Sequence, residues 1–280
     1  MNFICGDKFV AMSDFVYTIP NPDDYYKHPN TFTKEAVEAF TGIPIIYTLT
    51  GNARSLFDQI GKVNKKVVVI THSADVAADK RLYDLLPNNV VQWFSQNATF
   101  NGERLKGIPI GIENAQRIEF HHVHKADKLL AKMKEDKIYK NLVYLNCSVW
   151  TNQKERTPLY WKLGGKPWAT VVQQANIFDF DGYINNIHGH KFVACPSGNG
   201  VDTHRTWETL YLDSIPIERR ATHNIGWRDL PICFVDSWDE LTEDFLKAEY
   251  ERIINAAWNL DKLEFPWWET FIKSYTHECT

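Results

Sequence analysis

Residues 191–217, KFVACPSGNGVDTHRTWETLYLDSIPI, bring together side chains that could bind an anionic ligand. A short apolar strand is followed by a loop of small, turn-forming residues and then by a helix, which Asp202 is expected to cap and Thr203 to open. The first turn of such a helix directs free backbone N–H groups and the positive end of its dipole toward the loop. Arg205 adds a forked cation that suits phosphate oxygens. The pattern therefore predicts a diphosphate site beside Thr203 and Arg205.

Glu208 follows one turn later and shares a helix face with His204 and Arg205. Its carboxylate could accept hydrogen bonds from the diol of a ribose. The alternative is an ordinary capped helix with an internal pair between Arg205 and Glu208. The Gly-Asn-Gly loop is neither a G-x-G-x-x-G fingerprint nor a Walker loop, so neither a dinucleotide oxidoreductase nor a P-loop NTPase is indicated.

The elements that must position this segment alternate along the chain. Short apolar or β-branched runs predict strands at 45–49, 66–71, 90–94, 108–112, 142–145, 191–195 and 232–235. Amphipathic stretches predict helices at 53–60, 76–85, 125–137, 154–163, 180–187, 203–212, 241–260 and 266–275. This alternation predicts an α/β fold with parallel sheets covered by helices on both faces.

The length of 280 residues allows two domains. A lysine-rich helix at 125–137 precedes a fresh series of strands and helices, which favours Rossmann-like domains at 1–138 and 139–261. The last segment, 262–280, is expected to return to the first domain. Ligands of such proteins bind at the carboxyl ends of the strands, in the cleft between the domains.

Composition argues against several classes of protein. Hydrophobic residues make up 44% and charged residues 24%, which excludes disorder as the main state, and a net charge of −4 lacks the basic footprint of a nucleic-acid binder. The five cysteines form no C-x-x-C motif, so neither a zinc ribbon nor a disulfide scaffold is indicated. No signal peptide and no long apolar run is evident, so we expect a cytoplasmic protein without membrane insertion.

The run from Cys195 to Ile217 resembles the C-terminal signature of the exostosin-like glycosyltransferases, xylosyltransferases included, C-P-x-G-N-G-x-D-x-H-R-x-W-E-x-L-Y-x-G-x-I-P. Residues 71–75, 93–97, 108–114 and 146–156 agree more loosely, so the resemblance spans about residues 67–217. The compact size is similar to that of virus-encoded members. Two positions depart from the signature: Asp213 stands where relatives tend to have Gly, and Ser197 where a basic residue is frequent.

This resemblance implies a GT-B fold, with two Rossmann-like domains facing each other and a UDP-sugar, UDP-xylose being favoured, held by the second. It implies a glycan or glycoprotein acceptor, no cofactor, no metal and no nucleic-acid partner. Arg156 looks like the second cation that binds phosphate in this family. The residues assigned to donor binding are Asn146, Thr151, Asn152, Arg156, Ser197, Gly198, Asn199, Gly200, Asp202, Thr203, His204, Arg205 and Glu208.

An inverting transfer also needs a base from the first domain to deprotonate the acceptor hydroxyl. Asp75 is the first candidate, His72 the second and Glu113 the third, since each follows a predicted strand. Each could instead only bond its own loop, and Asp75 could cap the helix predicted at 76–85. The amides of Asn97, Asn114 and Gln96 are candidates for binding acceptor hydroxyls, and Trp93 or Trp150 for stacking on a sugar, although a core role is simpler for either indole.

Two other functions remain open. The pairs within 121–124 (HHVH) and 188–190 (HGH), together with His72, could form a metal site of a hydrolase, because H-x-H on a strand puts both imidazoles on one face. The chain could also be a non-catalytic glycan-binding protein with a transferase fold. Zinc analysis would test the first alternative, and stabilisation by nucleoside diphosphates would argue against the second.

Overall fold

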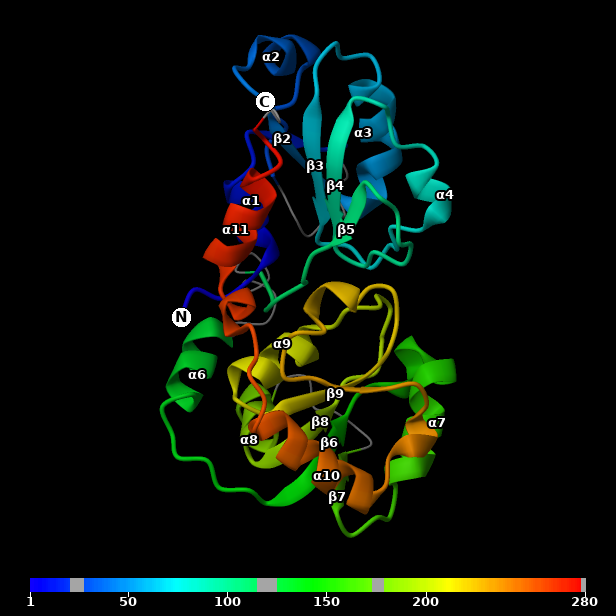
Figure 1. Cartoon of the computed structure of the whole chain (residues 1–280), viewed down its shortest axis with the longest axis vertical. Coiled ribbons are helices and arrows are strands. Elements are labelled where there is room, and N and C mark those ends of the chain that lie inside the picture. Colours follow the sequence, from blue (N-terminus) through cyan, green and yellow to red (C-terminus); the bar gives the residue numbers. More distant parts are fainter. Residues whose placement is uncertain (21–27, 115–124, 173–178, 278–280) are drawn as a thin grey trace. The chain divides into compact units, whose positions relative to one another are not determined.

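The computed structural model describes residues 1–20, 28–114, 125–172 and 179–277 (Figure 1). Contacts divide the chain into an N-terminal unit, residues 2–117 with 264–280, and a C-terminal unit, residues 118–263. Each unit contains a five-stranded sheet in which all neighbouring strands are parallel. The predicted α/β class is therefore confirmed. None of the helices within these ranges is long and apolar enough to cross a membrane.

The sheet of the N-terminal unit follows the order of the chain. Its strands are β1 (Phe15–Tyr17), β2 (Ile45–Leu49), β3 (Val67–His72), β4 (Val90–Ser95) and β5 (Leu105–Gly107). The helices between them are α2 (Lys34–Ala39), the 3₁₀ helix η1 (Thr50–Asn52), α3 (Ala53–Ile60) and α4 (Lys80–Tyr83). Because the strand order never reverses, right-handed crossovers place the connections on one face. Figure 1 shows α3 and α4 together on that side.

The other face of this sheet is covered by α1 (Gly6–Ala11) and α11 (Phe265–Lys273), which come from distant parts of the sequence (Figure 1). Successive residues of β4 show the two faces. Trp93 packs on Phe57 of α3 with ring centroids 5.2 Å apart, and Phe94 packs on Phe271 of α11 at 5.8 Å. Side chains of a strand alternate between faces, so both surfaces of the sheet are buried.

The sheet of the C-terminal unit reverses its order. Its strands, β6 (Asn141–Asn146), β7 (Ala169–Val172), β8 (His190–Ala194), β9 (Ile215–Arg219) and β10 (Cys233–Val235), lie in the order β7-β6-β8-β9-β10. Its helices are α6 (Lys125–Lys132), α7 (Gln153–Leu163), α8 (Phe180–His188), α9 (His204–Tyr211) and α10 (Glu243–Ile254), with 3₁₀ helices η3 (Val149–Thr151), η4 (Ile225–Trp227), η5 (Trp238–Glu240) and η6 (Leu260–Leu263). The reversal between β6 and β8 is a topological switch point, where ligands of doubly wound sheets bind.

Three expectations about elements differ from the structure. Residues 108–112 are not a strand: Pro109 lacks an N–H, Gly111 has φ +66, and a Cβ there would lie 2.1 Å from the carbonyl oxygen of Ile4. Of the helix expected at 76–85, only the short segment α4 (Lys80–Tyr83) is helical. The strands β1, β5, β7 and β9 and the helices α1 and α2 were not predicted.

The division between the units also differs from the expected boundary at 138. Helix α6 groups with the C-terminal unit, because Lys128 forms an ion pair with Asp181 and Lys125 lies 5.1 Å from the ring centroid of Phe180. The lysine-rich face of α6 therefore packs on α8, and the C-terminal unit begins at 118.

Candidate functional site

Arg156 of α7 joins the two loops that follow the switch-point strands β6 and β8. Its side chain is only 6% exposed. Its Nε donates to the carbonyl oxygen of Ser197 at 2.9 Å, and its Nη1 donates to that of Ser148 at 2.6 Å and to Thr151 Oγ1. Its Nη2 donates to the carbonyl oxygen of Pro196 at 3.4 Å. Arg156, predicted to bind phosphate, thus holds the loops in place with its guanidinium.

The loop after β8 fits closely around this guanidinium. A Cβ on Gly198 would lie 2.6 Å from Arg156 Nη2, so a larger residue would displace one of them. Asn152, the N-cap of α7, donates from Nδ2 to the carbonyl oxygen of Gly198 at 3.3 Å. The loop also closes on itself: the N–H of Gly198 donates to the carbonyl oxygen of Gly200 at 2.9 Å, and Ser197 Oγ donates to that of Val201 at 2.9 Å. Asn199 remains exposed at its tip.

Helix α9 begins without a side-chain cap. Its N-cap is Thr203, whose hydroxyl is buried and has no hydrogen-bond partner among the described residues. The expected cap, Asp202, instead accepts from the indole Nε1 of Trp207 at 3.1 and 3.2 Å. The prediction that Asp202 caps this helix was therefore wrong, because Asp202 anchors the core side chain of Trp207. The side chain of Thr203 therefore caps none of the N–H groups in the first turn of α9.

Arg205, at the second position of α9, has a buried Nε without a hydrogen-bond partner. Its guanidinium lies 5.8 Å from the ring centroid of Tyr183. Burial opposes the charge of Arg205, but the neighbouring Tyr183, Cys195 and Glu208 favour it, and the pKa of Arg205 is raised. Burial lowers the pKa of Arg156, and the nearby charge of Arg205 lowers it further. Two guanidiniums therefore lie within electrostatic range at this edge of the sheet.

Glu208 is buried and accepts a hydrogen bond from the hydroxyl of Tyr183 at 2.8 Å. Burial, followed by the charge of Glu208, raises the pKa of Tyr183 well above its ordinary value, so its phenol stays protonated and donates. Arg205 and Glu208, both in the described part of the chain, form no ion pair within 4.0 Å, so the expected alternative of an internal pair is not found. Tyr183 was not predicted: it lies on α8, and nothing local in the sequence links it to Glu208.

Asn146 ends β6 at the same edge of the sheet. Its Nδ2 donates to the hydroxyl of Tyr144 at 2.7 Å, while its buried Oδ1 has no partner. Burial raises the pKa of Tyr144, although the charge of Arg205 opposes this shift. His204 is half-exposed at the first position of that helix. Unpartnered buried atoms of Asn146, Thr203 and Arg205 thus gather around the switch point, and polar groups left in this way are satisfied by a ligand or by water.

In the N-terminal unit, His72 is buried at the end of β3 with both ring nitrogens engaged. Its Nε2 lies 3.1 Å from the carbonyl oxygen of Pro109, which can only accept, so Nε2 carries a proton. Its Nδ1 lies 3.1 Å from Ser73 Oγ. This geometry fixes the loop after β3, and the role of His72 as a base stays a prediction.

The amides proposed to bind an acceptor also hold this loop. Asn97 Nδ2 donates to the carbonyl oxygen of Ala74 at 3.0 Å, and Gln96 Oε1 accepts from the N–H of Ser73 at 2.8 Å. Asn114 Nδ2 donates to Ser73 Oγ at 3.2 Å, and its Oδ1 accepts from the N–H of Asp7 at 3.1 Å. Ser73 has φ +58, a conformation that these bonds impose.

Asp75 is exposed in this fixed loop, and no hydrogen bond or ion pair to it occurs among the described residues. It does not cap a helix, because α4 begins at Lys80 and is capped by Asp79, which accepts from the N–H of Leu82 at 2.9 Å. Glu113 is half-buried. Of the three base candidates, Asp75 is therefore the carboxylate presented to solvent.

Thr50 and Asn52, in η1 after β2, were not predicted as site residues. Thr50 Oγ1 and Asn52 Nδ2 are buried without partners, and Asn52 does not cap α3 with its side chain. The sequence contains a pattern that could have identified them as site residues. Thr50-Gly51-Asn52 joins a buried strand directly to a helix, as the Gly-Asn-Gly loop does in the C-terminal unit. These groups add hydrogen-bonding capacity at the carboxyl ends of β2 and β3.

The two indoles considered for sugar stacking have opposite environments. Trp93 is fully buried in the core of the N-terminal unit. Trp150 is 84% exposed in η3, directly before Thr151 and Asn152. Only Trp150 therefore presents a ring to ligands at the switch-point edge.

The histidine pair at 188–190 does not have the expected geometry. Residues 121–124 lie outside the described residues. His188 ends α8 and His190 begins β8, so these two do not share a strand, and the nitrogens of His190 lie 2.6 Å from the carbonyl oxygen of Asn186 and 2.8 Å from Thr170 Oγ1. Across the described ranges, no group of three or more His, Cys, Asp or Glu side chains is arranged to hold a metal ion.

Comparison with known proteins found no match, either to a family model or to a curated protein. Function is therefore inferred from the geometry of the site and from the resemblance of residues 195–217 to the exostosin-like signature.

Proposed function

We propose that the chain is a glycosyltransferase of GT-B organisation that binds a UDP-sugar at the switch point of the C-terminal unit and transfers the sugar to a hydroxyl of a glycan. One observation carries the proposal: helix α9 starts at the switch point without a side-chain cap, with the hydroxyl of Thr203 and the Nε of Arg205 buried and unpartnered. A diphosphate supplies the acceptor oxygens that these donors lack.

Each polar group has a role in this proposal. The N–H groups of α9, Thr203 and Arg205 bind the diphosphate and stabilise the negative charge that develops on it as the sugar leaves. Arg156 acts as a positioning residue, because its guanidinium is bonded to the loops on either side. Glu208, oriented by Tyr183, accepts from the ribose hydroxyls. Side chains and a helix dipole thus stabilise the negative charge on the leaving group, which is consistent with a transfer that needs no metal.

Asp75 is assigned as the base that accepts the proton of the acceptor hydroxyl. An inverting transfer requires a base on the opposite side of the sugar from the diphosphate. Asp75 is exposed in a loop fixed by hydrogen bonds from Gln96 and Asn97, so its carboxylate is accessible and its backbone is preorganised. Thr50 and Asn52 are suited to bind acceptor hydroxyls beside it, since their buried polar atoms have no partner.

The donor site is tested by the effect of UDP on thermal stability, since a ligand that binds only the folded state raises the melting temperature. UDP is expected to stabilise the wild-type protein, and the protein should hydrolyse a UDP-sugar slowly without acceptor. Arg205→Met should weaken UDP binding roughly 10–100-fold, the loss expected for a charge-assisted hydrogen bond. Arg81→Met, at an exposed arginine of α4, is the matched control.

Absence of UDP binding by the folded wild-type protein would overturn the proposal. Binding of glycans without any dependence on a nucleotide would instead support the non-catalytic alternative. A panel of UDP-sugars in the hydrolysis assay identifies the sugar, with UDP-xylose expected to be the most reactive.

A further inference from the structure

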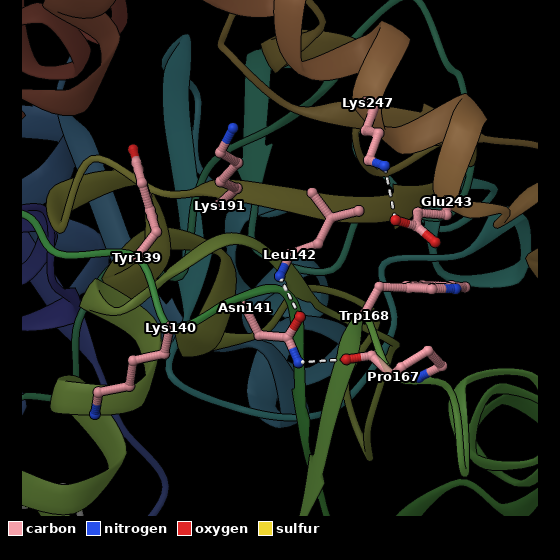
Figure 2. Close-up of a pocket in the computed structure, with 9 residues that line it drawn as sticks. All are labelled: Tyr139, Lys140, Asn141, Leu142, Pro167, Trp168, Lys191, Glu243 and Lys247. Atoms are coloured by element: carbon pink, nitrogen blue, oxygen red, sulfur yellow. Dashed lines mark hydrogen bonds and ion pairs between the residues drawn. The ribbon is translucent and has the colours of Figure 1, made fainter.

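A cavity lies in the C-terminal unit, at the edge of the sheet opposite to the switch-point loops (Figure 2). Its volume is about 390 Å³, within the range of small-molecule sites. It is formed by the residues at the amino ends of β6, β7 and β8 and by the first turns of α10. Since the strands are parallel, this edge is separated from their carboxyl ends by the length of the sheet.

The walls of this amino-edge pocket are aromatic and fixed. Leu142 lies between Tyr139 and Trp168 in Figure 2, and the half-buried Trp168 packs against the core of the unit. Asn141 connects the strands that carry these residues: its Oδ1 accepts from the N–H of Leu142 at 2.8 Å, and its Nδ2 donates to the carbonyl oxygen of Pro167 at 3.1 Å. The apolar surface is therefore present before a ligand binds.

Positive charge predominates at the rim. Lys247 pairs with Glu243 at 2.7 Å, the two being joined by a dashed line in Figure 2. Lys191 forms no ion pair with any described residue, and its Nζ lies 3.8 Å from the ring centroid of Tyr250. Tyr250 donates to the hydroxyl of Tyr139 at 3.2 Å, which holds both rings beside this ammonium group. Lys140 also lines the pocket, but its side chain points away from the other residues drawn.

We propose that the amino-edge pocket binds an anionic monosaccharide, a sugar that carries a phosphate or a carboxylate. The ring of such a ligand packs its C–H face on Trp168 and Leu142, as sugars do on aromatic side chains. Its hydroxyls exchange hydrogen bonds with the Glu243–Lys247 pair, which offers both an acceptor and donors. Its negative charge lies beside Lys191, whose compact ammonium has no carboxylate partner in the described part of the chain. This site is separate from the proposed donor site and does not depend on it.

The ligand class is tested by ligand-observed NMR and titration calorimetry on the full chain, with glucose 6-phosphate, glucuronate, glucose and inorganic phosphate as probes, in saturating UDP. Glucose 6-phosphate or glucuronate is expected to bind at least about tenfold more tightly than glucose and than phosphate, as one charge-assisted contact requires. Whichever of these two ligands binds more tightly shows whether a phosphate or a carboxylate is preferred. Equal binding of glucose, or a probe affinity that is lower in saturating UDP than in a parallel titration without UDP, would overturn the proposal.

Variants test whether the anionic sugar binds in the amino-edge pocket. Lys191→Met keeps the aliphatic stem and is expected to weaken the binding of the anionic sugar about tenfold while leaving that of glucose unchanged. Lys134→Met, at an exposed lysine outside the pocket, is the control. Trp168→Ala should abolish binding, whereas Trp161→Ala, at an 80% exposed indole of α7, should not. Unchanged affinity in Lys191→Met, which does not disturb the core, would overturn the assignment even if Trp168→Ala fails to fold.

Discussion

The two sheets of this chain contain the same number of parallel strands, but the polar side chains at the carboxyl ends of those strands differ in how they are hydrogen-bonded. At the carboxyl ends of β3 and β4, where the strand order is sequential, side chains bond one another: Trp93 Nε1 donates to Thr71 Oγ1 at 2.9 Å, and Thr71 Oγ1 donates to Ser95 Oγ at 2.7 Å. At the ends of β6 and β8, where the order reverses, polar atoms of Thr203 and Arg205 remain unpartnered among the described residues. In the sequential sheet, Thr50 and Asn52 after β2 also keep unpartnered buried atoms, so the contrast holds for β3 and β4.

Strand order explains the difference. Strands β3 and β4 are neighbours in the sequential sheet, so polar side chains at their carboxyl ends can pair with each other. At a reversal the two connections leave toward opposite faces, and the space between them is closed by a ligand. The comparison assigns nucleotide binding to the C-terminal unit and acceptor chemistry to the N-terminal unit. Three of the four predictions below test this assignment, and the other tests the stability of the C-terminal unit.

The largest effect is expected from Asp75→Asn in the N-terminal unit. Loss of a general base lowers the transfer rate by about 10²–10⁴-fold. UDP binding should be unchanged, because Asp75 forms no hydrogen bond or ion pair with a described residue and belongs to the other unit. Transfer kinetics and calorimetry with UDP measure the two effects. A normal transfer rate would remove Asp75 from the mechanism and leave the donor site intact.

Arg156→Met tests the tether between the switch-point loops. It leaves the carbonyl oxygens of Ser148 and Ser197 without their donor and should lower the free energy of unfolding by about 3 kcal/mol. UDP binding should be lost together with this stability. Urea denaturation and calorimetry provide the measurements. If stability falls while UDP affinity is kept, Arg156 does not position the donor site.

His223 makes the same edge of the C-terminal unit sensitive to acid. Burial lowers the pKa of His223 to about 4, so the folded state resists protonation while the unfolded state, near 6.5, accepts it. Stability is therefore complete above pH 6.5 and is lost as the pH falls toward 4, by at most about 3 kcal/mol. Urea denaturation at pH 7 and 4.5 should show a smaller loss in His223→Phe than in the wild type, and an equal loss in both would contradict the prediction.

A matched pair of glycines gives the smallest effect. Gly198→Ala places a Cβ 2.6 Å from Arg156 Nη2, whereas a Cβ on Gly51 meets nothing within 4 Å. Gly198→Ala should cost about 2 kcal/mol, as overpacking does, and weaken UDP binding. Gly51→Ala should leave both unchanged. Similar effects of the two substitutions on UDP affinity would show that the donor site is not confined to the C-terminal unit.

Local pattern explains which elements could be predicted. The strand Ile45–Leu49 and the helix Ala53–Ile60 have the predicted bounds, because a buried apolar run and an amphipathic stretch are separated by a glycine. The edge strands β1 and β7 are too short for a periodicity, and β9 contains Pro216, which is atypical of a strand with neighbours on both sides.

The same limit applies to the site. The loop and helix at 196–208 were recognised because their signals are contiguous in sequence. The tethering role of Arg156 depends on carbonyl groups about forty positions away, and the hydrogen bond from Tyr183 to Glu208 joins two helices. Neither contact has a signature in sequence spacing. Asp202 shows the opposite case. Its residue type is typical of helix caps, but its carboxylate instead accepts a hydrogen bond from the indole of Trp207.

The cover of the N-terminal sheet has a consequence for biosynthesis. Helix α11, whose Phe265 N–H donates to the carbonyl oxygen of Asn2 at 2.9 Å, is translated only after the whole of residues 118–263. The contiguous C-terminal unit can therefore mature on the ribosome while Phe94 and its neighbours still lack Phe271. The unit that is synthesised first is completed last, and in the interval its uncovered strands are a natural target for chaperones.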